Sequence, residues 1–257
     1  MVIYCNGDSF VQGHGLGDSI LPGYPHGADQ FECAEWVKDS YSPSNTNREL
    51  YAAEISKLEI ERRWSSKLEV LSGHKVINSA QAGGSMQRTA RTTISDLIKL
   101  KQTESDIIAI IGISPISRSE LYYKLAWWSI NPGSIDQYKS EPLLESYCKL
   151  KIEHYTDDHS NLVQWYLSTI QIYDFCKNNN IPLLWVDTYQ TRIWPKSVHR
   201  NVEILKSYID INYDIIMDDL EVQNGPKFLP DGHFSEEIHA LTAEALNTRI
   251  KEIQGTQ

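Results

Sequence analysis

Two short segments at opposite ends of the chain carry residue types that suit acyl-transfer chemistry. Gly7–Phe10 reads Gly-Asp-Ser-Phe and follows an apolar run, and Asp231–His233 reads Asp-Gly-His. A serine hydroxyl becomes a nucleophile when an imidazole takes its proton and a carboxylate orients that imidazole. These residue types predict Ser9 as the nucleophile, His233 as the general base and Asp231 as the orienting acid.

Each segment also has a purely structural interpretation. Asp8 and Ser9 are favoured residues at the N-cap of a helix. Asp231–His233 could form an Asx-turn that caps the last predicted helix. The two segments occur together with a strand before Ser9 and a glycine turn between them, and we therefore favour the catalytic interpretation.

Two further turns could supply the groups that stabilise a developing oxyanion. Gly83–Gly84 is a turn of small residues, and Gly112–Ser114 follows the most apolar run of the chain. Backbone N–H groups and small polar side chains are the usual oxyanion donors. In a parallel sheet all these turns can meet at the carboxyl edge, where ligands bind.

The elements that would position these turns alternate along the chain. Short apolar runs predict strands, and wider apolar periodicity predicts helices. The predicted strands are Val2–Cys5, Lys75–Asn78, Asp106–Gly112, Ile181–Asp187 and a weak segment at 213–217. The predicted helices are 48–72, 86–101, 161–178, 198–209 and 235–253. This order predicts a three-layer α/β/α, doubly wound, mainly parallel sheet.

We expect a single domain over residues 1–257, with insertions at about 11–47 and 115–155. The first is a long irregular segment and could form a wall of the substrate cleft. The second contains Trp127–Trp128 and several tyrosines, which could stack on a sugar ring or fill a small core. Asp8, Gly84 and Arg118 are candidate substrate-binding residues beside the predicted nucleophile.

The chain resembles the SGNH (GDSL-like) hydrolase family in the order and spacing of these segments. Gly7–Phe10 resembles the nucleophile block of that family, and Asn78 followed by Gly83–Ser85 is similar to its second block. The resemblance implies a flavodoxin-like α/β fold and a serine esterase that needs no cofactor and no metal. It also implies that the N–H groups of Ser9 and Gly83 form the oxyanion hole.

The third and last blocks depart from the family pattern. The third block usually supplies an asparagine as an oxyanion donor, and Ser114 stands at that position. Losing one such donor costs on the order of 100- to 1000-fold in rate, and the Ser114 hydroxyl could replace part of it. Other side chains that could reach in are Asn6, Gln81 and Arg118. The last block, usually Asp-x-x-His, is one residue shorter at Asp231–His233.

Composition limits the partners. The net charge is −10 and no lysine- or arginine-rich run is present, which argues against nucleic acid as a partner. The four cysteines show neither Cys-x-x-Cys nor zinc-ligand spacing, which indicates a reduced compartment. We find no signal-peptide pattern and no apolar run that would span a bilayer, and we expect a cytoplasmic protein that does not act at a membrane.

The leading hypothesis is therefore a serine hydrolase that cleaves an ester, such as an O-acetyl group on a carbohydrate or another small acyl ester. Two other functions remain open from the residues alone. A catalytically degenerate binding or structural protein on the same fold would show departures like those in the third and last blocks. An acyltransferase would use the same triad with an acceptor other than water.

Overall fold

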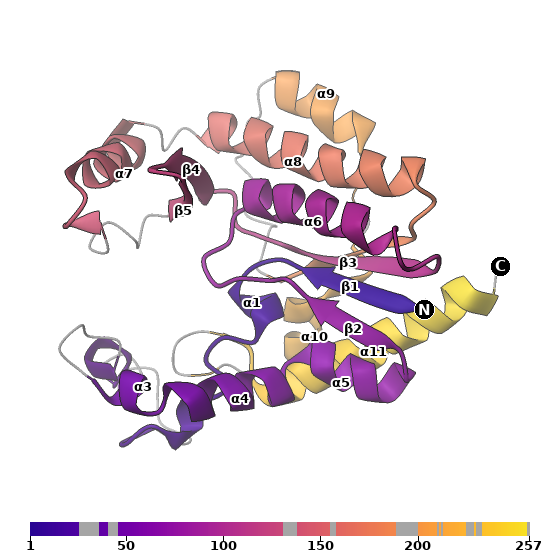
Figure 1. The fold of residues 1–257 in the computed structure, drawn as a ribbon, viewed down its shortest axis with the longest axis horizontal. Coiled ribbons are helices and arrows are strands. Elements are labelled where there is room, and N and C mark those ends of the chain that lie inside the picture. The colour runs from indigo at the N-terminus through magenta and orange to yellow at the C-terminus, as the bar shows by residue number, and fades with distance from the viewer. Residues whose placement is uncertain are drawn as a thin grey trace.

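The computed structural model describes residues 1–25, 36–40, 46–130, 138–154, 158–188, 200–209, 211, 213–224, 229 and 233–255. Within these ranges the central sheet has five strands in the order β2-β1-β3-β6-β7, and every neighbouring pair is parallel (Figure 1). The strands are β1 (Val2–Asn6), β2 (Lys75–Asn78), β3 (Ile107–Ile113), β6 (Leu183–Asp187) and β7 (Ile215–Ile216).

The sheet has the flavodoxin-like order, in which the chain reverses direction across the sheet between β1 and β3. β1 and β3 are buried along their whole length, as continuous apolar runs in a central parallel sheet should be. Ligands in such sheets bind beyond the carboxyl ends of the strands at this reversal. Ser9 follows β1 and Ser114 follows β3, so both residues lie at the expected edge.

Helices cover both faces of the sheet, which confirms the predicted three-layer α/β/α class (Figure 1). Alternate strand residues feed opposite cores: Ile3 packs in one cluster and Tyr4 in the other. The described helices are α1 (Ser9–Gln12), η1 (Asp18–Ile20), α3 (Asn47–Leu50), α4 (Ala52–Arg62), α5 (Trp64–Ser72), α6 (Met86–Leu100), α7 (Pro142–His154), α8 (Asp158–Asn178), α9 (Arg200–Tyr208), α10 (Met217–Asn224) and α11 (Glu236–Gly255).

The single helix predicted over 48–72 is wrong, because the chain breaks it twice. Tyr51 interrupts it between α3 and α4, and Arg63 adopts an extended conformation between α4 and α5. The second break has a tertiary cause. The Trp64 N–H at the start of α5 donates to Nδ1 of His239 on α11 (3.2 Å), so a distant side chain satisfies a donor that helix termini leave open.

The insertion at 115–155 contains a β-hairpin that we did not predict. β4 (Ser119–Tyr123) and β5 (Ala126–Ile130) pair antiparallel around Lys124 and Leu125. Both turn residues have positive φ, 49° and 63°, the conformation in which hairpins usually place Asn-Gly. The hairpin and α7 lie on the side of the molecule to which the carboxyl ends of the strands point (Figure 1).

The chain approaches itself closely where β1 and β3 end, and only glycine fits there. A Cβ on Gly7, whose φ is +152°, would lie 2.6 Å from Cγ2 of Val11. A Cβ on Gly112 would lie 2.2 Å from the same atom. These glycines let α1 pack directly on the end of β3, which fixes the height of Ser9 above the sheet.

The described ranges have two further features. None of the helices described is both long and apolar enough to span a bilayer. Three cysteines, Cys5, Cys148 and Cys176, are buried free thiols, whereas Cys33 lies outside the described residues.

Candidate active site

Ser9 is the first residue of α1, directly after the turn that leaves β1. Asp8 is the N-cap, and its Oδ1 accepts the Phe10 N–H (3.1 Å). The helix ends after one turn at Gly13, in a left-handed conformation (φ 84°). The capping interpretation of Asp8 is thus correct, and it also places Ser9 at the carboxyl edge. Ser9 is 4% exposed, so it lies deeper than a simple surface turn would place it.

His233 reaches this turn from the other end of the chain. Its ring lies 4.7 Å from the Phe10 ring, centroid to centroid, and its charge acts on the Asp8 carboxyl. The ring of His233 therefore lies beside the residue that follows Ser9. Ser9 and His233, both described, do not form a hydrogen bond with each other in this structure; such bonds often tighten only when substrate binds.

The predicted acid cannot be placed in the same way. Asp231 and the intervening Gly232 lie outside the described residues. Phe234, the residue after His233, is buried against Phe10 with ring centroids 5.4 Å apart. This contact attaches the segment that carries His233 to α1, independently of the acid.

A second histidine, His14, which the sequence analysis did not single out, lies at this site. The His14 ring is 5.2 Å from the His233 ring, edge to face. Its Nδ1 lies 3.6 Å from Oε1 of Glu59 on α4. His14 stands between Gly13 and Gly15, both with φ of 84°. A histidine between two glycines just after a strand turn was the available signal, because such glycines fold the chain back on itself.

The Gly83–Gly84 turn packs directly on the turn that carries Ser9. Gln81 N–H donates to the Gly7 carbonyl (3.3 Å), and Ala82 N–H donates to Oε1 of Gln12. A Cβ on Gly84 would lie 3.1 Å from the Gly7 oxygen, and Gly83 has φ +73°. No hydrogen bond among the described residues uses the N–H groups of Ser9 or Gly83.

Asn78 of the second block supports this arrangement structurally. Its Nδ2 donates to the Val11 carbonyl (3.0 Å) and to Oγ of Ser65 (2.8 Å), and its Oδ1 accepts the Ala80 N–H (2.9 Å). The side chain thus joins α1, α5 and the turn after β2. Its position in the sequence motif is explained by this role.

Ser114 is completely buried after β3. Its N–H donates to Sδ of Met86 (3.4 Å) and its carbonyl accepts from Nε1 of Trp165 (2.9 Å). Its hydroxyl has no hydrogen-bond partner among the described residues. Ser114 forms no hydrogen bond with Ser9 or Gly83, all three of which are described, so its role as an oxyanion donor stays a prediction.

Of the other side chains considered as replacement donors, Asn6 and Arg118 already donate elsewhere, whereas Gln81 is held through its carbonyl oxygen. Asn6 Nδ2 donates to hydroxyl groups on α6, including that of Thr92 (2.7 Å). Gln81 Oε1 accepts from Nε of Arg88 (2.9 Å). Arg118 Nη1 donates to Asp8 Oδ2 (2.9 Å), so two of the three residues predicted to contact substrate bind each other.

The Asp8–Arg118 ion pair places a buried negative charge and its counter-ion directly before Ser9 in the turn. Asp8 is fully buried and the Arg118 side chain is 20% exposed. Burial raises the pKa of the Asp8 carboxyl, and the Arg118 charge, the Phe10 N–H and the His233 charge oppose that rise. Among the described residues, no cluster of three or more His, Cys, Asp or Glu side chains could hold a metal ion.

A buried histidine behind the site gives a pH-dependent stability. Burial, with a smaller effect of the His233 and Lys67 charges, lowers the pKa of His239 to about 3 from 6.5. The unfolded chain therefore binds one more proton than the folded chain between these pH values, and stability falls as the pH falls through this window.

We expect His239→Gln to remove this dependence of the free energy of unfolding on pH. The variant should be less stable than the parent at pH 7, and the difference should shrink by up to about 1.4 kcal/mol per pH unit between pH 6.5 and 3. Urea unfolding at several pH values in that window measures it. A difference that stays constant with pH would contradict the assignment of His239 as a buried neutral histidine.

Comparison with known proteins places the fold. No protein-family model matches the chain, and no curated protein sequence matches it. The esterase EstA from Pseudoalteromonas sp. matches in structure with a TM-score of 0.50 and 10% identity, over 99% of this chain and 98% of its own. A G-D-S-L family protein from Desulfitobacterium hafniense DCB-2 matches with a TM-score of 0.45 and 13% identity, over 96% of this chain and 98% of its own. At such identities the likeness to EstA concerns the fold.

Proposed function

We propose that the chain is a serine hydrolase that cleaves esters, with Ser9 as the nucleophile and His233 as the general base. The observation that carries the proposal is the contact of the His233 ring with Phe10, the residue directly after Ser9 (ring centroids 4.7 Å apart). Residues from the two ends of the chain come together at the carboxyl edge, where the fold binds ligands.

In this mechanism the Ser9 hydroxyl oxygen attacks the acyl carbonyl while His233 takes its proton. The negative charge that develops on the carbonyl oxygen is held by the N–H groups of Ser9 and Gly83, which the described residues leave free, and by the Ser114 hydroxyl. His233 then protonates the leaving alcohol. Water attacks the acyl-enzyme in the same manner and releases the acid.

Asp231 would orient the His233 ring and stabilise its charged form. His14, paired with Glu59, lies against the edge of the same ring. A small acyl group such as acetyl, on a carbohydrate or another alcohol, suits the proposal. EstA, which shares the fold, is an esterase that was solved with monoethylphosphonate as inhibitor, and this supports ester hydrolysis as the reaction class.

The test is the hydrolysis of p-nitrophenyl acetate by the whole chain and by His233→Ala. We expect the variant to lose on the order of 100-fold or more in kcat, because it lacks its general base. Added imidazole should restore part of the rate, since His233 is partly exposed and its removal leaves a space open to solvent. His74→Ala, at the opposite edge of the sheet beside Lys75, is the matched control and should keep full activity.

A parent without esterase activity would favour the degenerate binding protein. A parent that is slow with water but fast with an added alcohol would favour an acyltransferase. If His233→Ala were as active as the parent, the assignment of the base would be wrong.

A further inference from the structure

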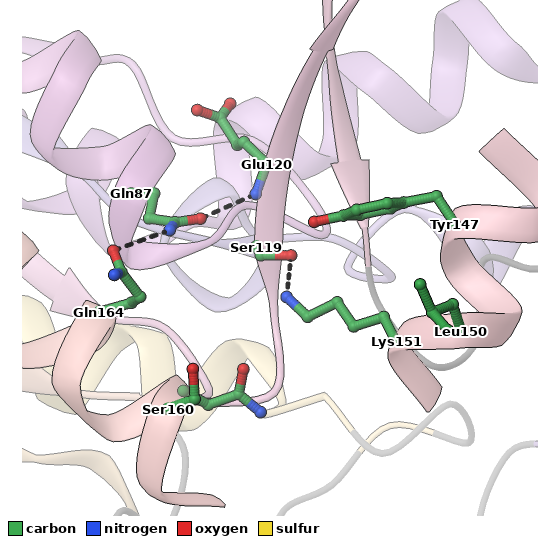
Figure 2. Close-up of a pocket in the computed structure, with 9 residues that line it drawn as sticks. Gln87, Ser119, Glu120, Tyr147, Leu150, Lys151, Ser160 and Gln164 are labelled. Carbon is green, nitrogen blue, oxygen red and sulfur yellow. Dashed lines mark hydrogen bonds between the residues drawn. The ribbon is translucent and has the colours of Figure 1, made fainter. Parts of the chain in front are cut away.

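A polar pocket of about 380 Å³ lies between α6, β4, α7 and α8. It is enclosed by α6, the β4–β5 hairpin, α7 and α8 (Figure 2). The residues that line this α6–α8 pocket are Gln87, Ser119, Glu120, Tyr147, Leu150, Lys151, Ser160, Asn161 and Gln164. Eight of these nine side chains are polar, so the pocket is suited to a polar ligand.

Among the described residues, no ion pair compensates the one positive charge of the pocket. Lys151 on α7 points across the pocket and donates to the Ser119 hydroxyl (Figure 2). It forms no ion pair within the described part of the chain, and burial lowers the pKa of its ammonium group. A buried cation without a counter-ion is electrostatically unfavourable, and a negatively charged ligand that pairs with it removes part of this free-energy cost.

The acidic residue among the lining side chains does not neutralise this charge. Both carboxylate oxygens of Glu120 bind Arg91, at 2.8 and 3.2 Å, and the side chain is 4% exposed. Figure 2 shows its carboxylate turned away from Lys151. Glu120 contributes its backbone N–H instead, which donates to Oε1 of Gln87 (2.9 Å).

The remaining lining groups are neutral donors and acceptors. Gln87 Nε2 donates to Oε1 of Gln164 (3.5 Å), and this leaves the Gln164 amide N–H groups for a ligand. The side chains of Ser160, Asn161 and Tyr147 have no hydrogen-bond partner within the described residues. Amides and hydroxyls at several points around one ammonium match a ligand with several hydroxyls and one negative charge.

Two chain connections join this pocket to Ser9. Ser119 directly follows Arg118, whose guanidinium binds Asp8, the residue before Ser9. Gln87 is in the first turn of α6, directly after the Gly83–Gly84 turn and its N-cap Ser85. Both connections begin at the carboxyl ends of strands, so the pocket lies on the same side of the sheet as Ser9.

We propose that the α6–α8 pocket holds a hydroxyl-rich, carboxylate-bearing alcohol, such as a uronic acid residue, as the alcohol part of the ester that Ser9 cleaves. The placement of the ester rests on the proposed function, whereas the binding itself does not. A single lysine supplies one positive charge, which one carboxylate neutralises, whereas a phosphate monoester carries about 1.5 to 2 negative charges at pH 7.

The test is a titration of the intact chain with D-glucuronate and, separately, with D-glucose, followed by calorimetry. We expect glucuronate to bind on the order of tenfold or more tighter than glucose, because a hydrogen bond to a charged group is worth this much. Lys151→Gln should abolish the preference. Lys149→Gln, an exposed lysine on the same helix that pairs with Glu145, is the control and should keep it.

A second variant protects the test if Lys151→Gln fails to fold. Asn161→Asp adds a negative charge at a partly exposed position, and should weaken glucuronate binding about tenfold or more while leaving glucose binding unchanged. Equal affinity for the two sugars, no binding of either, or an unchanged preference in the variants would overturn the proposal.

The two proposals fail in distinguishable ways. Ser9→Ala should bind glucuronate as tightly as the parent, because Ser9 does not line the pocket. Glucuronate binding in a chain without esterase activity would sustain the pocket and remove the proposed function. Esterase activity at Ser9 without any preference for glucuronate would do the reverse.

Discussion

Replacing Ser9 with alanine is expected to lower kcat for p-nitrophenyl acetate by at least about a thousandfold, because no other group at the turn can form the acyl-enzyme. The fold should persist. Ser9 lies at the start of α1 and its hydroxyl makes no hydrogen bond to the described residues, so the free energy of unfolding should change by about 1 kcal/mol or less. Steady-state kinetics and urea unfolding of the same preparation measure both quantities.

Ser168→Ala is the matched control for this prediction. Ser168 is as buried as Ser9, at 5% and 4% exposed, and lies on α8, where its hydroxyl donates to the Gln164 carbonyl (2.8 Å). We expect full activity in this variant. A Ser9→Ala protein that is folded and still hydrolyses the ester at the parental rate would show that Ser9 is not the nucleophile.

Arg118→Met is expected to lower the free energy of unfolding by about 3–5 kcal/mol at pH 7, the largest loss among the proposed variants. It leaves the Asp8 carboxylate fully buried without its cation. Burial already raises the pKa of Asp8 above 3.8, and removing Arg118 would raise it further. An acid of this kind takes up a proton on folding, so stability falls as the pH rises from about 3.8 toward the raised value. The loss should therefore be larger at pH 7 than at pH 4, as measured by urea unfolding.

The double variant Asp8→Asn/Arg118→Met separates charge from packing. Asparagine is also a good N-cap, so the double variant should be more stable at pH 7 than Arg118→Met alone and should lose its pH dependence. Lys149→Met, which breaks an exposed pair with Glu145, should change stability by about 0.5 kcal/mol or less. Additive effects of the two site substitutions would contradict a coupled buried pair.

The sheet and its carboxyl edge could be predicted from the sequence because their signals are local. β1, β3 and β6 are continuous apolar runs, and a turn of small residues follows the first two. The β4–β5 hairpin could not be predicted, because Lys124 and Leu125 adopt positive φ without the glycine or asparagine that marks such turns. The break at Arg63 depends on His239, which is 175 residues beyond the Trp64 N–H that it binds.

Part of the site could be predicted because the turns that carry it have local sequence signals. Ser9 stands in a recognisable turn, and the Gly83–Gly84 turn follows a strand. The partners that shape the site come from tertiary packing: Arg118 binds Asp8 across 110 residues, and His14 meets His233. No local sequence pattern encodes these pairings. The α6–α8 pocket could not be predicted either, because residues from α6, β4, α7 and α8 form it together.

The most direct test of the central claim is the reaction of the intact chain with a fluorophosphonate, read by intact mass and peptide mapping. An activated serine attacks phosphorus and retains the phosphonate as a stable ester. We expect one adduct, located at Ser9 and missing from both Ser9→Ala and His233→Ala. The absence of any adduct on the parent, or an adduct that persists in Ser9→Ala, would contradict the account.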